Sequence, residues 1–140
     1  MMGYRSRRKR ERNIKLSIWV VQSLLAGIFM MAGFMKTTLP IESLGQSHPW
    51  ANQVPELLVR FIGFVELLGG IGLLVPAMFR YRPEWSNYAA VGLVLLMVVA
   101  MVYHLVKAEY GAIPTNIILA SFGVYVLWGR YKKDPITPAS

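Results

Sequence analysis

Cysteine is absent from this 140-residue sequence, and histidine occurs only at His48 and His104. Without cysteine, the chain itself can form no disulfide, no thiol redox couple, no cysteine-ligated iron–sulfur cluster and no covalent haem attachment. Two histidines also leave few nitrogen ligands for a metal ion. We therefore expect no metal, haem or iron–sulfur site within this chain.

Charged residues are scarce as well. They make up 16% of the chain, whereas hydrophobic residues make up 55% and the mean hydropathy is +0.44. Soluble domains carry about 25% charged residues, so this composition indicates an integral membrane protein. The chain is nevertheless basic, with 15 Lys and Arg against 7 Asp and Glu. No nucleic-acid-reading motif accompanies the basic residues, and we expect no nucleic-acid partner.

Long apolar segments dominate what is present. The first covers residues 16–35 without a charge, and a helix of this length extends about 30 Å, enough to span a bilayer. It exceeds the ~7 to 15 apolar residues of a signal peptide, so we expect it to be retained. The sequence predicts an all-α membrane protein whose transmembrane domain, residues 16–129, is a four-helix bundle with helices at residues 16–35, 57–79, 86–106 and 113–128.

The distribution of Lys and Arg predicts the orientation of these helices. Twelve of the 15 fall in residues 1–15, in the turn between the second and third helices, and in the tail at residues 130–140. The other three are Lys36, Arg60 and Lys107. Because cytoplasmic loops are rich in Lys and Arg, we expect the basic N-terminal segment and the basic tail to lie inside the cell, with the chain in the cytoplasmic membrane.

Glu66 lies near the middle of the second apolar segment. Insertion of a charged side chain at the centre of a transmembrane helix costs roughly 2.5 to 3.5 kcal/mol, so such residues usually face other helices and pair. The predicted topology places Lys36 and His104 in the same half of the membrane. Either could pair with Glu66 and hold helices together. Alternatively, Glu66 handles a ligand or a proton, or is protonated and uncharged.

The predicted polar cluster of the outer half has five members, Lys36, Arg60, Glu66, His104 and Asn116. Each has a simpler interpretation. The cationic side chains could extend to lipid headgroups, His104 could cap its helix, and Asn116 could satisfy backbone groups in a first turn. Small residues beside these polar groups indicate helix interfaces. The sequence therefore predicts a ligand-binding or structural polar cluster, without a complete catalytic set.

Four sequence segments share a pattern with a known family. They are AGFMK at residues 32–36, RFIGFVELLGGIGLLVPA at 60–77, AAVGLVLLMVVAMVYHL at 89–105 and PTN at 114–116. In this order the chain resembles the DoxX-like family of small four-helix membrane proteins over roughly residues 17–130. The resemblance implies a bacterial cytoplasmic-membrane location and a recurring polar set of Lys36, Glu66 and His104, without a catalytic role.

Two functions are open at this point. The first is a non-catalytic membrane subunit of a redox or small-ligand complex, in which the polar cluster lines a pocket for a quinone-like molecule. Quinone carbonyls need hydrogen-bond donors, and a partner membrane or redox protein would supply catalysis. The second is a scaffold or assembly chaperone whose glycine-rich faces receive other helices, and a homo-oligomer is also open. Proton transport would need a polar path through the cytoplasmic half, where only Gln22 stands.

Overall fold

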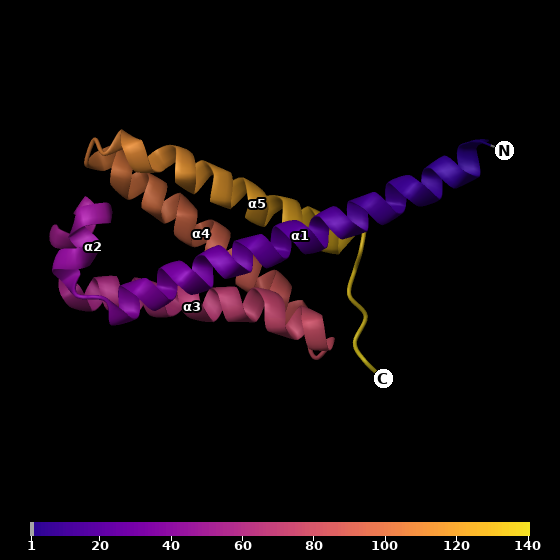
Figure 1. Cartoon of the computed structure of the whole chain (residues 1–140), viewed down its shortest axis with the longest axis horizontal. Helices are drawn as coiled ribbons and strands as arrows, with labels where there is room; N and C mark the ends of the chain where they lie inside the picture. Colours follow the sequence, from indigo (N-terminus) through magenta and orange to yellow (C-terminus); the bar gives the residue numbers. More distant parts are fainter. Residues whose placement is uncertain (1) are drawn as a thin grey trace.

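The computed structural model describes residues 2–140, and most of this chain is helical (Figure 1). The four long helices are α1 (Met2–Thr38), α3 (Glu56–Phe79), α4 (Glu84–Val106) and α5 (Ile113–Lys132). Each contains a stretch long and apolar enough to cross a bilayer. The expected all-α membrane fold is confirmed.

The long helices run alternately up and down and pack in a ring. α1 packs on α3, α3 on α4, α4 on α5, and α5 returns to α1. Both ends of the described chain lie at one end of this assembly, and the short helix α2 (Ile41–Ser47) lies at the other (Figure 1). We call these the terminal end and the α2 end.

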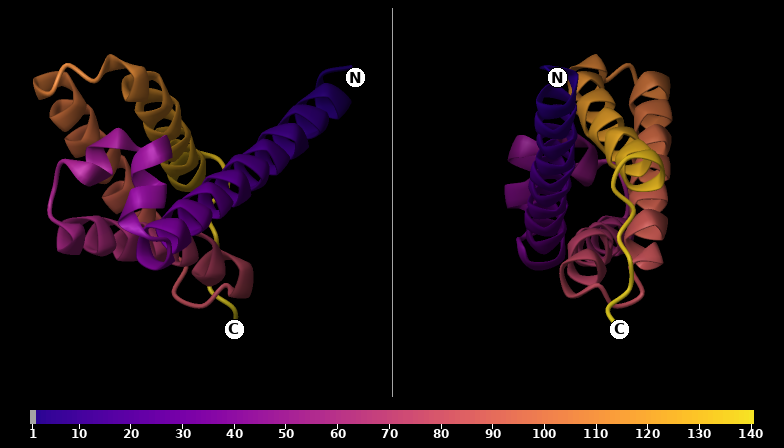
Figure 2. Two further views of the ribbon diagram at one scale, coloured as in Figure 1. Left: turned by 60° about the vertical axis from the view of Figure 1, so that its left-hand side comes forward. Right: turned by 90° about the vertical axis from the view of Figure 1, so that its right-hand side faces the viewer.

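Helix α1 is much longer than the predicted first helix because the basic segment before residue 16 is helical too. The helix continues without a break to Thr38, and Figure 2 shows its first turns projecting beyond the other helices. Arg and Lys are good helix formers, and no proline interrupts the segment. The side chains of residues 3–13 are exposed, which keeps the cluster of cations solvated.

The proline-containing connection between α1 and α3 is partly helical. Prolines precede α2 and α3, at Pro40 and Pro55, and Pro49 begins the short 3-10 helix η1 (Pro49–Asn52). Proline suits a helix start because its missing N–H would have no partner within the helix there. A small apolar cluster holds this connection against the ends of α1 and α3, and its buried members are Leu44, Ala51 and Val59.

Glycines allow α1 and α3 to approach closely. A Cβ atom at Gly33 would lie 2.5 Å from the backbone oxygen of Gly63 and 2.5 Å from the backbone nitrogen of Leu67. At Gly70 it would lie 2.8 Å from the backbone oxygen of Ala26. No side chain fits at such distances, so small residues at this interface let the backbones touch. The main apolar core lies between all four long helices, with Phe29, Leu73, Leu93 and Val126 among its buried members.

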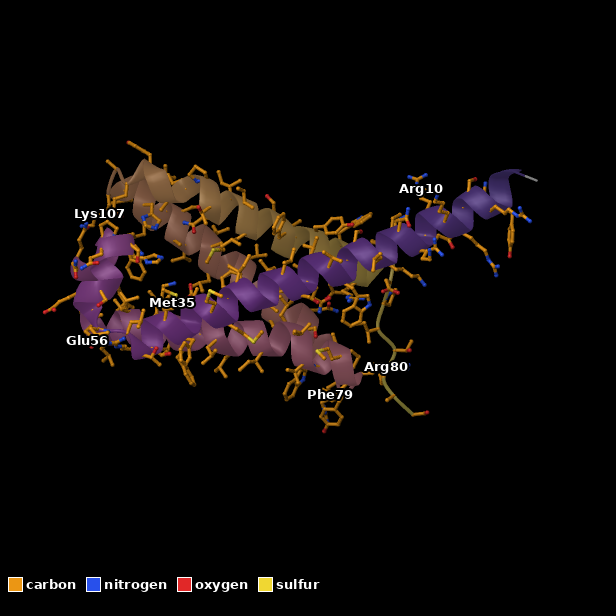
Figure 3. All side chains as sticks on the ribbon, in the orientation of Figure 1. Arg10, Met35, Glu56, Phe79, Arg80 and Lys107 are labelled. Atoms are coloured by element: carbon orange, nitrogen blue, oxygen red, sulfur yellow. The ribbon has the colours of Figure 1, made fainter. Side chains whose placement is uncertain are left out.

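The chain after α5 returns along the terminal end. Arg80 ends α3 in the left-handed conformation, with φ 54°. Its guanidinium donates to the backbone oxygen and the hydroxyl of Thr137, at 2.9 and 2.8 Å, and its own backbone oxygen accepts from the N–H of Ala139. These hydrogen bonds tie the tail to the turn between α3 and α4, and Figure 3 labels Arg80 beside the tail.

Candidate functional site

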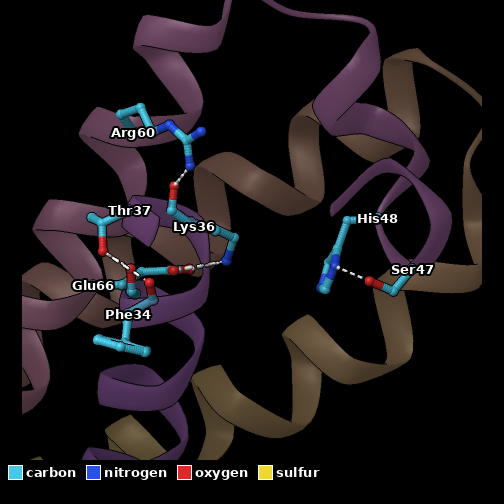
Figure 4. Close-up of polar contacts among 8 residues, drawn as sticks. Phe34, Lys36, Thr37, Ser47, His48, Arg60 and Glu66 are labelled. Carbon is cyan, nitrogen blue, oxygen red and sulfur yellow. Dashed lines mark hydrogen bonds and ion pairs between the residues drawn. The ribbon is translucent and has the colours of Figure 1, made fainter. Parts of the chain in front are cut away.

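Lys36 and Glu66 form a buried ion pair between α1 and α3. The Lys36 Nζ atom lies 2.8 Å from Glu66 Oε1 and 2.7 Å from Glu66 Oε2 (Figure 4). Only 8% of Lys36 and 4% of Glu66 is exposed. The ammonium group thus meets both carboxylate oxygens, which is the geometry that a charge pair needs to offset its desolvation.

The close approach of α1 and α3 explains why this pair forms. A Cβ atom at Gly63, one turn before Glu66, would lie 2.6 Å from the Cβ atom of Lys36. Residues three positions apart share a helix face, so Gly63 and Glu66 both face α1. The missing side chain at Gly63 leaves room for the Lys36 stem, and the next residue on this face of α3 receives its ammonium group.

Arg60 lies beside this pair but serves the end of α1. Its Nη1 atom donates to the backbone oxygens of Lys36 and Leu39, at 2.8 and 2.7 Å, and its Nη2 atom lies 2.8 Å from Glu56 Oε1. The last carbonyls of a helix have no partner within it, so Arg60 satisfies them from the neighbouring helix. Arg60, a member of the predicted cluster, therefore lies close to Lys36, and its contact is with the backbone oxygen of Lys36.

His104 takes a different partner from Glu66. Its Nδ1 atom lies 2.9 Å from Glu109 Oε2, and Glu109 Oε1 accepts a hydrogen bond of 2.8 Å from Gln53. This chain of contacts joins the end of α4 to the connection before α3. His104 and Glu109 provide two potential metal ligands, and across residues 2–140 no group of three or more His, Asp or Glu side chains comes together to hold a metal ion.

Two buried polar atoms on the last turn of α4 and the first turn of α5 have no hydrogen-bond partner within the described chain. They are the Tyr103 hydroxyl and the Asn116 Nδ2 amide nitrogen. A buried polar group without a partner costs about 1 to 3 kcal/mol, so each is available to a hydrogen-bonding ligand that reaches it. Asn116 belonged to the predicted cluster, whereas Tyr103 did not.

A groove runs along α1 and ends at Lys36. It is a partly open groove, lined by residues of α1 from Ser23 to Lys36 and, at the α2 end, by Leu44 and His48, and its volume is about 500 Å³. Pockets for small molecules measure about 300 to 1,000 Å³. Lys36 therefore belongs both to a helix-joining ion pair and to the wall of a space large enough for a ligand.

His48 is the groove residue that sequence reasoning did not select. Figure 4 shows its ring on the side of the Lys36 amine opposite Glu66. The pKa of His48 lies below its usual 6.5 because the ring is partly buried and, secondarily, because Lys36 repels a second positive charge. The Ser47 hydroxyl lies 3.0 Å from Nδ1. Only its place in a Pro-rich connection preceding Trp50 could have drawn attention to it.

A second buried polar network lies toward the terminal end. The Nε atom of Arg130 donates to Gln22 Oε1 at 2.8 Å, and Gln22 Nε2 donates to the backbone oxygen of Leu73 at 2.6 Å. Arg130 also pairs with Asp134 at 2.8 Å and stacks over Trp19 at 4.3 Å from the ring centroid. The sequence showed Gln22 as an isolated polar residue and Arg130 as a tail charge, so this network was not predicted.

Comparison with known proteins identifies one similarity. Residues 20–126 match a family described as the DoxX-like family. These residues overlap all four apolar stretches and include all five members of the predicted polar cluster. No curated protein and no solved structure matches the chain.

Proposed function

We propose that this chain, which belongs to the DoxX-like family and contains four helices long and apolar enough to cross a membrane, is a non-catalytic membrane component of a redox or small-ligand-handling complex. Its part in that complex is to hold a quinone-like molecule in the groove along α1. The bilayer is its immediate environment. A partner membrane or redox protein supplies the catalytic centre.

The observation that carries this proposal is the position of the Lys36–Glu66 pair at the end of the groove. A pair that only joined two helices could be enclosed on all sides. Here the Lys36 side chain also lines a space of about 500 Å³ whose other walls are mainly apolar. A small number of polar groups in a mainly apolar cavity is the usual form of a site for a small molecule. Quinone carbonyls accept hydrogen bonds from such donors.

The uneven distribution of Lys and Arg between the two ends supports a location of the site in the outer half of the membrane. The terminal end carries the projecting basic turns of α1, and the α2 end carries few cations. By the excess of Lys and Arg on the cytoplasmic side, the terminal end lies inside the cell and the α2 end outside. The groove and the Lys36–Glu66 pair then occupy the outer half of the cytoplasmic membrane.

Retention of decylubiquinone by the purified full-length chain in lipid nanodiscs tests this function. We expect saturable retention above that of empty nanodiscs. The double variant Lys36→Met/Glu66→Gln removes the polar end of the groove without leaving a lone charge, and it should lose most of the retained quinone. A melting measurement on the same sample controls for unfolding. A wild-type chain that retains no more than empty nanodiscs would contradict the proposal.

A scaffold or assembly chaperone is the second candidate, and the structure weakens the argument for it. That argument needs glycine-rich faces that are free to receive other helices. The glycines of α3 are in close contact inside the chain: Gly63 with Lys36, Gly69 with Leu93, Gly70 with Ala26. Copurification of one stoichiometric membrane protein in mild detergent, from a chain that retains no quinone, would favour this second function over the first.

A further inference from the structure

The groove follows one face of α1. Leu24, Ile28, Met31 and Met35 recur at intervals of three or four residues, which places them on one side of the helix. Leu24, Ile28 and Met31 are 56, 41 and 68% exposed, so this face is open along its length rather than covered by another helix. In a bilayer it therefore opens sideways to lipid, and a molecule dissolved in the membrane can reach it without crossing the headgroup region.

Gly27 lies in the middle of this face and makes it hollow. A Cβ atom at Gly27 would have no heavy atom within 4 Å among the described residues. The glycines of the α1–α3 interface are enclosed, so the reason for glycine at 27 is not close packing inside this chain. Its missing side chain leaves a depression in the wall of the groove, midway between Ser23 and Met31.

The α2 end of the groove carries its polar groups. Lys36 has three N–H groups, and the two carboxylate oxygens of Glu66 accept from this ammonium. The third N–H makes no hydrogen bond within the described chain, so it can donate to another acceptor, while the Nζ atom also lies 6.0 Å from the centroid of the Trp50 ring. His48 provides a ring Nε2 atom, because Ser47 engages Nδ1. Leu44 and His48 line the groove beside Lys36 at this end.

We infer that this groove is a lateral binding site for a neutral, single-tailed amphiphile with a carbonyl-bearing ring, whose tail lies along α1 past Gly27 and whose head reaches Lys36 and His48. The inference rests on the proposed function and specifies its site, its route from the bilayer and the charge of its ligand. The head accepts a hydrogen bond from Lys36. The Nε2 atom of His48 donates to a carbonyl in one tautomer and accepts from a hydroxyl in the other.

Electrostatics favours a neutral head over an anionic one. The charge of Lys36 is already balanced by Glu66 at 2.7 Å, so an anionic head would compete with that carboxylate and be repelled by it. His48 does not provide a second cation near neutral pH, because its pKa lies below its usual 6.5. A neutral carbonyl meets neither penalty, and it satisfies the remaining donor.

Two matched variants separate this site from any other. Gly27→Leu places an apolar side chain in the hollow of the groove, at a position where the Cβ atom would meet no heavy atom within 4 Å among the described residues. Gly92→Leu makes the same change on α4, at another exposed glycine whose Cβ atom would meet nothing within 4 Å in the described chain. With the full chain in nanodiscs, we expect Gly27→Leu to weaken decylubiquinone retention at least tenfold and Gly92→Leu to leave it unchanged. His48→Leu should weaken it several-fold.

The outcomes distinguish this inference from the proposed function. Retention by the wild type with no difference between Gly27→Leu and Gly92→Leu would overturn the groove and leave the function standing. No retention at all would overturn both. Monoolein, a neutral ester, and oleate, an anion, test the head: monoolein retained in place of the quinone would overturn the quinone-like head, and stronger retention of oleate would overturn the neutral head. Displacement of decylubiquinone by neither compound supports the inference as stated.

Discussion

Two cationic side chains are buried among the described residues, one toward each end of the helices, and they are accommodated differently. Lys36 bonds to a carboxylate on the neighbouring helix and lines a groove. Arg130 lies 3% exposed, bonds to Gln22 and Asp134, and stacks over the ring of Trp19. Both arrangements lower the cost of burying a charge, but only the first leaves the cation beside a space that a ligand can occupy.

The difference teaches which polar residues in a membrane helix point to binding. A planar guanidinium makes several directed hydrogen bonds and stacks on an aromatic face, so it is well suited to joining protein groups. A lysine ammonium is compact and has three donors, and Glu66 leaves one of them free. Burial therefore does not distinguish the two cations. A leftover donor does not distinguish them either, because the Arg130 Nη2 atom is buried without a hydrogen-bond partner in the described chain. The feature that distinguishes Lys36 is the groove beside it.

Removing Lys36 alone should give the largest loss of stability. Lys36→Met leaves the Glu66 carboxylate buried without a partner, and we expect the free energy of unfolding to fall by about 3 to 5 kcal/mol. The double variant Lys36→Met/Glu66→Gln has no lone charge and should regain most of this loss. Unfolding by a denaturing detergent measures both. Additive losses from the two single changes would show that the residues do not interact.

Crowding the α1–α3 interface should have the next largest effect. In Gly33→Ala the new methyl group would lie 2.5 Å from the backbone of α3, so α1 must move away and the ion pair loosens. We expect a loss of about 1 to 3 kcal/mol. Gly27→Ala on the open face of α1 is the matched control, and it should be neutral or slightly stabilising because alanine favours helix. Equal effects of the two changes would contradict the close packing.

Arg130→Lys tests the other half of the comparison. Lysine keeps the charge but loses the directed fork and the planar stacking on Trp19, and we expect a loss of about 1 to 2 kcal/mol. The exposed Arg82→Lys serves as the control and should change nothing. Decylubiquinone retention should be the same in both variants and the wild type. A drop in retention for Arg130→Lys alone would show that the two ends are coupled.

The smallest effect should come from titration of His48. Burial and, secondarily, Lys36 lower the pKa of His48 in the folded protein below 6.5, so the unfolded chain binds a proton at a higher pH than the folded chain. The stability due to neutral His48 is therefore complete above pH 6.5 and is lost as the pH falls through the folded pKa. Melting at pH 7.5 and 5.5 should show a smaller pH effect in His48→Gln. An unchanged difference would contradict this assignment.

Much of the fold followed from local sequence properties. Hydropathy and length identified the four membrane segments, because a helix of about 20 apolar residues matches the thickness of the hydrocarbon core of a bilayer, whatever its neighbours are. The boundary before residue 16 was different: the exposed basic segment continues α1, since helix propensity acts outside the membrane as well. A transition from charged to apolar residues marks where a helix enters the membrane, and it need not mark where the helix begins.

The sequence alone determined that Glu66 needs a polar partner, because an unpaired carboxylate inside a membrane is costly wherever the helix packs. It left Lys36 and His104 as equal candidates. Tertiary structure decided between them: glycines at 33 and 63 bring α1 and α3 together beside Lys36, while His104 turns to Glu109. The groove lined by α1, Leu44 and His48, and the burial of Arg130 against Trp19, depend on how helices approach and rotate. Those are properties of packed neighbours, which no single segment of sequence contains.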